Sequence, residues 1–323
     1  MNAIVLKMYN RTILKSSTGL KCCGLLMLAV YAVSAQPAYT NWETPVNLGT
    51  VNSPGVDQHP AISKNGLSLY FVSDRPGGIG GWDIYVSQRP SLDAPWGPAT
   101  NLGSTFNSPA TENAPDLSRD GHLLFFGSNR PGGCGGSDIW VAYRRDTHDD
   151  FAWEAPVNLG CSINTQFDED GPTYFVDDDT GLTSLYFTSL NRPNNIGDWD
   201  IYVSTVQPDG TFGAGRIVPE LNSPARDTRT SISRNGLEMY ITSSRGGGLG
   251  GLDVWIATRA SINALWSQPV NLGAPVNSSA NEGGPALSFD GTTLYFYSTR
   301  AGGSGSNDLY VTSRTKLRGD HSH

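Results

Sequence analysis

Residues 60–75 read PAISKNGLSLYFVSDR, and residues 285–300 read PALSFDGTTLYFYSTR. Both stretches place alternating apolar and polar residues on either side of an Asn-Gly or Asp-Gly pair, which is the usual signal of a tight β-hairpin. A glycine-rich loop and a further strand-like segment follow, as in PGGIGGWDIYVSQR at 76–89. The pattern predicts strands rather than helices, and its recurrence indicates an internal repeat.

This block occurs five times along the chain. In each copy an aromatic residue and a PVNLG-like segment precede an Asn-containing pair, the hairpin and the glycine loop. The PVNLG-like segments lie at 45–49, 99–103, 156–160, 217–221 and 269–273. Each block supplies four short strands, and four-stranded units repeated around an axis are the blades of a β-propeller. Five copies therefore predict five blades.

The order of segments at the two ends of the repeat region predicts ring closure. Residues 42–49 form an outermost strand that precedes any inner strand, whereas the fifth copy stops after the strand at 308–314. The surplus strand fits the vacancy and leaves no unpaired edge. We therefore predict an all-β, closed five-bladed β-propeller of four-stranded blades over 42–314, with the N-terminal strand completing the last blade.

The first 35 residues differ from the rest. They hold four basic residues and no acid, an apolar run at 24–30 and a small-residue stretch at 32–35. This order predicts a signal peptide over 1–35, cleaved after Ala35, and a periplasmic or secreted bacterial protein. The alternative is an uncleaved anchor, but the run is shorter than the roughly 20 residues that span a bilayer. A short linker at 36–41 and a polar C-terminal tail at 315–323 would flank the propeller.

The composition is turn-rich and acidic. The 323 residues include 38 Gly and 20 Pro, and only 16% are charged. The formal net charge is −8, and it becomes −12 when the four basic residues of the leader are removed. This balance argues against nucleic acid as a partner and favours cations, neutral glycans or peptides.

The repeat resembles a known family. The units S-x-[DN]-G-x-x-L-Y-F-x-S-x-R and G-x-x-D-I-Y-V look like the TolB-type, WD-like propeller repeat of bacterial envelope proteins, over essentially all of residues 42–314. TolB itself has six blades and an extra N-terminal domain. The variant with Trp, PVNLG and a Gly-Gly loop is more similar to propellers attached to OmpA-like proteins. The resemblance implies a binding or scaffolding module of the envelope.

One acid precedes the inner hairpin and one Arg ends it in every repeat. Their separation is 18 residues in four repeats and 23 in the third. Five-bladed glycosidases place carboxylates at the starts of inner strands, so the acids have two interpretations: a catalytic or cation-binding ring, or structural ion pairs. The constant spacing favours ion pairs, because a catalytic set needs asymmetry. The expected pairs are Asp57–Arg75, Glu112–Arg130, Glu169–Arg192, Asp227–Arg245 and Glu282–Arg300.

Strand direction places the glycine loops and the Asn-containing loops on one face, which we call the top face. A few residues near the axis on this face break the repeat: His59, Asp116, Asp170 and Arg229. Asp168, Glu169 and Asp170 also form a local acidic cluster, of a type that holds Ca²⁺. The cluster lacks the spacing of a known calcium loop, so no cofactor is predicted and Asp168 and Asp170 are only candidate Ca²⁺ ligands.

Two tryptophans, Trp82 and Trp199, lie in top-face glycine loops where the other repeats have Ser, Leu or Asn. Flat aromatic rings beside polar groups suit contacts with sugars or peptides. Packing against a neighbouring loop is the alternative. With His59, Asp170 and Arg229, these residues form the predicted ligand-binding set.

Two functional hypotheses remain. The main one is a monomeric, non-enzymatic binding or scaffold propeller whose top face holds a glycan, a peptidoglycan fragment or an envelope protein. The alternative is a polysaccharide-acting hydrolase or lyase, with Asp116, Glu169 or Asp170 as acid and base and Arg229 or His59 holding the substrate. No known catalytic motif occurs in the sequence, which favours the first hypothesis.

Cys134 and Cys161 are the two cysteines that remain after removal of the leader. Cys134 lies in the second glycine loop, and Cys161 directly follows the neighbouring outer strand. Export places both in an oxidising compartment. We therefore expect a Cys134–Cys161 disulfide, with two free thiols as the alternative.

Overall fold

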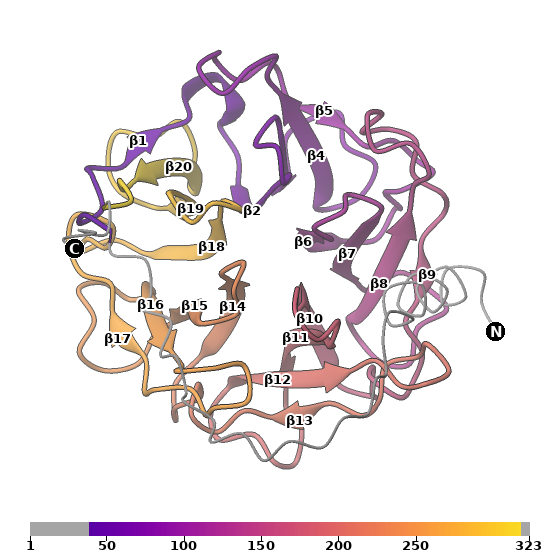
Figure 1. Ribbon diagram of the computed structural model, residues 1–323. Helices are drawn as coiled ribbons and strands as arrows, with labels where there is room; N and C mark the ends of the chain where they lie inside the picture. The colour runs from indigo at the N-terminus through magenta and orange to yellow at the C-terminus, as the bar shows by residue number, and fades with distance from the viewer. Residues whose placement is uncertain (1–38, 318–323) are drawn as a thin grey trace, which may run out of the picture.

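The computed structural model describes residues 39–317, and these residues form five four-stranded sheets. Figure 1 shows the sheets arranged around a central axis, with one strand of each sheet at the axis and one at the periphery. All neighbouring strands within a sheet pair antiparallel. The predicted all-β, five-bladed propeller is confirmed.

The blades follow the chain in order. The first contains β2 (Asp57–Ile62), β3 (Ser68–Ser73), β4 (Asp83–Gln88) and β5 (Thr100–Asn101). The second contains β6 (Glu112–Leu117), β7 (Leu123–Ser128), β8 (Asp138–Tyr143) and β9 (Val157–Asn158). The third contains β10 (Asp168–Val176), β11 (Thr183–Leu190), β12 (Trp199–Thr205) and β13 (Arg216–Ile217). The fourth contains β14 (Asp227–Ile232), β15 (Glu238–Ser243), β16 (Asp253–Thr258) and β17 (Val270–Asn271).

The fifth blade is built from both ends of the described chain. It contains β18 (Glu282–Leu287), β19 (Thr293–Ser298) and β20 (Asp308–Ser313), and β1 (Val46–Asn47) is its outer strand. In the pairing of β1 with β20, Val46 lies opposite Val311 and Asn47 opposite Tyr310. The N-terminal strand therefore completes the last blade, and the ring is closed.

The outer strands are shorter than the sequence predicted. The segment 42–49 was expected to be one strand, but only Val46–Asn47 is assigned to β1, and a short 3-10 turn, η1 (Gly49–Val51), follows. Gly49 has a left-handed backbone (φ 57°), and its N–H donates to Asn47 Oδ1. This local hydrogen bond turns the chain away from β20 and ends the strand.

Pairing between the chain ends also extends beyond the expected boundaries. Tyr39 forms an antiparallel bridge with Lys316, and the N–H of Thr40 donates to the carbonyl of Thr315. These residues fall in the predicted linker and tail. The predicted signal peptide lies outside the described residues. Within the described residues, no helix has the length and apolar character needed to cross a membrane.

Each inner strand carries a β-bulge near its start. In β2 the pairing with β3 shifts between Gln58 and Ala61, and the other inner strands shift at equivalent positions. One residue of each bulge has a left-handed backbone, and we call these five residues the axial ring: His59 (φ 50°), Ala114 (φ 50°), Gly171 (φ 59°), Arg229 (φ 49°) and Gly284 (φ 59°). Bulges re-aim side chains and are frequent beside active sites. Here they turn one residue per blade toward the axis.

Apolar side chains of neighbouring blades pack against each other between the sheets. One such cluster joins Tyr70 and Val72 of the first blade to Phe126 and Trp140 of the second. In the second blade a covalent link supplements the apolar packing. Cys134 and Cys161 form a disulfide, with Cα atoms 5.6 Å apart.

Candidate functional site

The five repeated acids lie in ion pairs within their own blades. Each acid is the first or second residue of its inner strand, rather than preceding that strand as expected, and each is fully buried. The Arg–carboxylate distances are 2.6 Å for Asp57–Arg75, 2.9 Å for Glu112–Arg130, 2.8 Å for Glu169–Arg192 and 3.2 Å for Glu282–Arg300, and Asp227 contacts Arg245 in the same way. Glu169 was also a candidate acid or base. Its carboxylate is held by Arg192 and does not line the pocket described below, so we do not assign it a catalytic role.

A pocket of about 750 Å³ opens on the top face at the axis. Its volume falls within the range typical of small-molecule sites. Trp82 and Trp199 are half-buried in its wall, and His59, Asp170 and Arg229 lie at its base. Trp82 also packs on the apolar cluster between the first two blades. The structure thus brings together the residues that formed the predicted ligand-binding set.

Asp170 is the most highly bonded residue of this pocket. Its oxygens accept hydrogen bonds from both terminal nitrogens of Arg229, each at 2.9 Å. They also accept hydrogen bonds from Asn113 Nδ2 at 2.8 Å and from the backbone N–H of Gly171 at 2.7 Å. A bidentate Arg–carboxylate pair is geometrically specific, and here it crosses from β10 to β14. The two charges fix each other at the base of the pocket.

Glycines leave the space that this cluster occupies. A Cβ added to Gly127 would lie 2.3 Å from Asp170 Oδ1, and one added to Gly171 would lie 3.1 Å from a terminal nitrogen of Arg229. A Cβ on Gly284 would lie 2.9 Å from His59 Cδ2. The packing at the axis therefore depends on residues without side chains at these positions.

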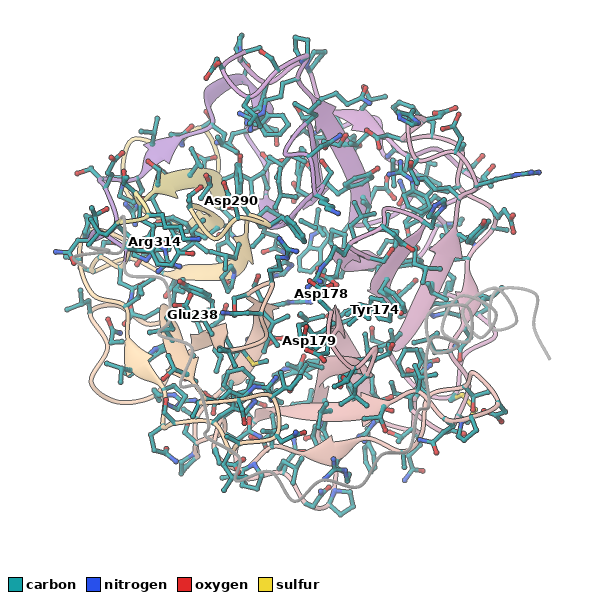
Figure 2. The ribbon with its side chains drawn as sticks, in the orientation of Figure 1. Tyr174, Asp178, Asp179, Glu238, Asp290 and Arg314 are labelled. Atoms are coloured by element: carbon teal, nitrogen blue, oxygen red, sulfur yellow. A yellow bond between two sulfur atoms is a disulfide. The ribbon has the colours of Figure 1, made fainter. Side chains whose placement is uncertain are left out.

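A narrow channel continues below the axial ring, with a volume of about 120 Å³, which is room for a few water molecules. Asp116 lines this channel and not the pocket above it. One of its oxygens accepts the N–H of Tyr174, labelled near the centre of Figure 2, at 2.7 Å. Burial raises the pKa of Asp116 from the usual 3.8 to about 7, although the N–H of Tyr174 acts in the opposite direction.

Side chains at the bottom face narrow the other end of the channel. Phe289 is surrounded by Lys64, Arg119 and Arg234, whose cationic groups lie 4.7, 5.2 and 4.7 Å from the ring centroid. Asp178, labelled in Figure 2, contacts both arginines. A ligand of sugar size therefore has access to the axis from the top face.

The acidic cluster of the third blade does not converge on one point. Asp168 accepts the N–H of Ser137 at 2.8 Å, Glu169 contacts Arg192, and Asp170 contacts Arg229. Among residues 39–317 no group of three or more His, Cys, Asp or Glu side chains is arranged to hold a metal ion.

Sequence reasoning did not assign Asn113 or Tyr297 to the site. Asn113 lies between His59 and Asp170, and Tyr297 packs edge-on against His59 with centroids 5.4 Å apart. A signal for Tyr297 was present. The residue before the last Ser of the second strand varies among the blades, being Val72, Gly127, Thr188, Thr242 and Tyr297, and the fifth blade has the one aromatic ring among these five.

No protein-family model matches the chain, and no curated protein matches its sequence. Solved structures do match. A GH62 hydrolase in complex with xylotriose has a TM-score of 0.56 at 12% identity, over 86% of this chain and 99% of that one. An α-L-arabinofuranosidase from Lactobacillus brevis has a TM-score of 0.56 at 16% identity, over 85% and 96%. An α-L-arabinofuranosidase from Podospora anserina in complex with cellotriose has a TM-score of 0.54 at 13% identity, over 86% and 98%.

These similarities support the five-bladed fold and correct two expectations. The similar structures are glycoside hydrolase propellers, so they do not support the TolB-type, WD-like assignment. The prediction of a non-enzymatic binding or scaffold propeller is wrong, because the proteins that share this architecture over most of both chains are enzymes that cleave glycosides. The alternative prediction of a polysaccharide-acting hydrolase is the one that they favour.

Proposed function

We propose that this protein is a glycoside hydrolase that cleaves a neutral polysaccharide or oligosaccharide in the axial pocket. The observation that carries the proposal is the pocket itself, in which two tryptophan rings and two carboxylates face one space of about 750 Å³. Aromatic rings provide flat apolar surfaces for sugar rings, and carboxylates provide the acid–base chemistry of glycoside cleavage. Two similar propellers were solved with xylotriose and cellotriose, which supports a glycan as the ligand.

Asp168 and Asp170 are the two carboxylates in the pocket wall. They lie two residues apart on one face of β10, with Cα atoms roughly 6.5 Å apart. Glycosidases use a pair of carboxyl groups separated by roughly 5 to 9.5 Å, and two aspartate side chains on one face of a strand at this Cα spacing can reach such a separation. Asp170 is held by Arg229 and Asn113, so we assign it the role of nucleophile or base. The carboxylate of Asp168 accepts the N–H of Ser137, and we assign it proton transfer to the leaving oxygen.

Asp116 takes a different place in this proposal. It lies below the axial ring in a channel that is too small for a sugar, so any proton it exchanges with the pocket passes through water. His59 and Arg229 line both the channel and the pocket. The predicted direct role of Asp116 as acid or base is therefore replaced by a role as a buried proton reservoir.

The charges of the pocket favour hydrolysis over elimination. A lyase that acts on uronates needs a cation to neutralise the substrate carboxylate. In the described pocket Arg229 is paired with Asp170, and Arg226 is paired with Asp198 at 3.1 Å. No unpaired guanidinium lines the wall, and Asp168 adds a negative charge. This electrostatic balance disfavours a uronate and favours an uncharged sugar.

We also propose that the enzyme acts after export, in the periplasm or outside the cell, because residues 1–35 have the composition of a secretory leader. Large polysaccharides are found in these compartments. The glycan would be its main partner.

The proposal is tested with the purified protein lacking residues 1–35. Arabinoxylan, xylan, xyloglucan and short oligosaccharides are incubated with the enzyme, and released sugars are quantified by chromatography. We expect release from at least one neutral glycan. Asp170→Asn and Asp168→Asn should each lower the rate by about 100-fold or more, in the range of lost acid–base catalysis.

Asp179→Asn is the matched control. Asp179 belongs to the same blade but is exposed in the hairpin between β10 and β11, where Figure 2 labels it beside Asp178, and it does not line the pocket. Its substitution should leave the rate unchanged. Absence of product from the whole panel, or full activity of Asp170→Asn with an intact fold, would contradict the proposal.

A further inference from the structure

The amide of Asn113 has a defined orientation. Its Oδ1 accepts the backbone N–H of Ala114 at 3.0 Å, and a backbone N–H only donates. Its Nδ2 lies 2.8 Å from Asp170 Oδ2, and a carboxylate held by an arginine only accepts. Exchanging the amide oxygen and nitrogen would place two donors together at Ala114 and two acceptors together at Asp170. The oxygen of Asn113 therefore faces His59.

This orientation determines which nitrogen of His59 carries a proton. His59 Nδ1 lies 2.9 Å from Asn113 Oδ1, and that oxygen is an acceptor. Nδ1 must then be the donor. Burial lowers the pKa of His59 well below the usual 6.5, and the positive charge of Arg229 lowers it further. The ring is neutral at neutral pH, so the proton on Nδ1 leaves a lone pair on Nε2.

The position of this lone pair is also fixed. Tyr297 packs edge-on against the imidazole at an interplanar angle of 82°, and Gly284 lies against its Cδ2 edge. The left-handed backbone of His59 at the bulge directs the ring toward the axis. Within residues 39–317, Nε2 has no hydrogen-bond partner, and the ring lines both the pocket and the channel. Nε2 is an acceptor that is accessible at the base of the pocket.

We propose that His59 determines substrate specificity by accepting a hydrogen bond at Nε2 from one hydroxyl group of the bound sugar. This inference rests on the proposed function, because it takes a glycan as the ligand. The class of group is set by the chemistry of the acceptor. A hydroxyl donates to the lone pair, whereas a carboxylate or an ether oxygen at the same point has nothing to donate. The sugar at the base of the pocket is therefore recognised through a free hydroxyl.

The protonation state is measured without any glycan. ¹⁵N NMR of the histidine side chains distinguishes the two ring nitrogens. The signals of His59 are assigned because they are absent from the spectrum of His59→Phe. We expect a protonated Nδ1 and an unprotonated Nε2 from pH 6 to pH 8. Arg229, Tyr297 and, through Asn113, Asp170 are the titratable or charged groups facing this ring. A proton on Nε2, or a charged ring in this range, would overturn the proposal even if the enzyme is active.

Recognition is measured with xylotriose and with xylotriose deoxygenated singly at each hydroxyl of its terminal sugars. His59→Phe keeps an aromatic ring and removes the acceptor. We expect it to weaken xylotriose binding about tenfold or more. One deoxy compound should bind the wild type as weakly as xylotriose binds His59→Phe. The affinity of that compound should not fall further in His59→Phe. His148→Gln is the control, because that side chain is 96% exposed.

The outcomes separate the two proposals. If Asp170→Asn abolishes hydrolysis and His59→Phe leaves binding of every compound unchanged, the role of His59 is refuted and the proposed function stands. If no glycan is bound or cleaved by the wild type, both proposals fail. If each deoxy compound loses the same affinity in the wild type and in His59→Phe, the hydroxyl contact is assigned wrongly.

Discussion

The guanidinium of Arg314 lies over the ring of Trp42, with its central carbon 4.6 Å from the ring centroid. These residues come from opposite ends of the propeller. Arg314 also contacts Glu238 of the fourth blade at 3.0 Å, a pair labelled in Figure 2, and donates to the carbonyl of Gly291. One side chain therefore links the segment before β1, the segment after β20 and a neighbouring blade.

Removing this link should destabilise the whole ring. Arg314→Ala leaves the Glu238 carboxylate without its partner, and both side chains are largely buried. We expect the free energy of unfolding in urea to fall by about 3 kcal/mol, the lower range for breaking a buried pair. Arg89→Ala is the comparison. Arg89 lies over Trp96 within the first blade but has no carboxylate partner among residues 39–317, so Arg89→Ala should lower the free energy of unfolding by less. Equal losses would argue against a special role in closure.

The repeated ion pairs predict that removing a buried arginine lowers the free energy of unfolding more than removing an exposed one. Arg192→Ala leaves Glu169 charged and fully buried, so we expect a loss of about 3–5 kcal/mol. Arg226→Ala removes the pair with Asp198, whose side chains are about half exposed, and should cost below about 1 kcal/mol. Chemical denaturation of both variants measures the difference. Similar values would show that the repeated pairs do not stabilise the blades.

The shifted pKa of Asp116 predicts how stability changes with pH. Between about pH 4 and pH 7 the folded protein keeps the proton of this carboxyl while the unfolded chain has lost it, so stability falls as pH rises. Asp116→Asn removes this dependence. The stability of the variant relative to the wild type should rise from pH 4 to pH 7, by up to about 4 kcal/mol. Asp179→Asn should show no such trend. A difference that is constant with pH would contradict the shift.

Gly127, which lies beside Asp170, predicts an effect on activity that acts only through the position of the Asp170 carboxylate. Gly127→Ala places a methyl group 2.3 Å from Asp170 Oδ1, so the carboxylate must leave its contacts with Arg229 and Asn113. We expect hydrolysis to fall at least about tenfold, since small displacements of catalytic groups are costly. Gly246→Ala is the matched control, because its Cβ would meet nothing within 4 Å. Unchanged turnover in Gly127→Ala would show that the position of Asp170 is not critical.

The repeated features of this molecule could be predicted from sequence because each occurs in all five repeats. The turn signals, strand patterns and the 18-residue interval from Asp57 to Arg75 are local, and neighbouring strands of one hairpin bring their ends together. The spacing between Cys134 and Cys161 is similarly local, since adjacent strands carry both. Five copies made each pattern visible above chance.

The axial cluster depends on information of another kind. Asn113, Asp170 and Arg229 come from three successive blades, and the repeat places them near the axis without showing which side chains touch. The bulges decide how these side chains are aimed, because a bulge changes the register by one residue. The importance of Gly127 could not be predicted from sequence either, because its contribution is to leave room for the carboxylate of Asp170. The main functional prediction was wrong for a related reason: the carboxylates proposed for catalysis, Asp168 and Asp170, match no recognised catalytic motif, so the sequence favoured a binding module.

The bulge in each inner strand has a consequence for redesign. The residues of the axial ring are skipped in the pairing of their strands, so their side chains are not required by the ladder that holds each blade. His, Ala, Gly, Arg and Gly occupy these five places within otherwise similar blades. The propeller thus separates its mechanical framework from the residues at its centre. Exchanging His59, Ala114 and Arg229 in combination, while Gly171 and Gly284 are kept because an added Cβ at either would crowd its neighbours, would give a library in which selectivity changes while the framework is kept.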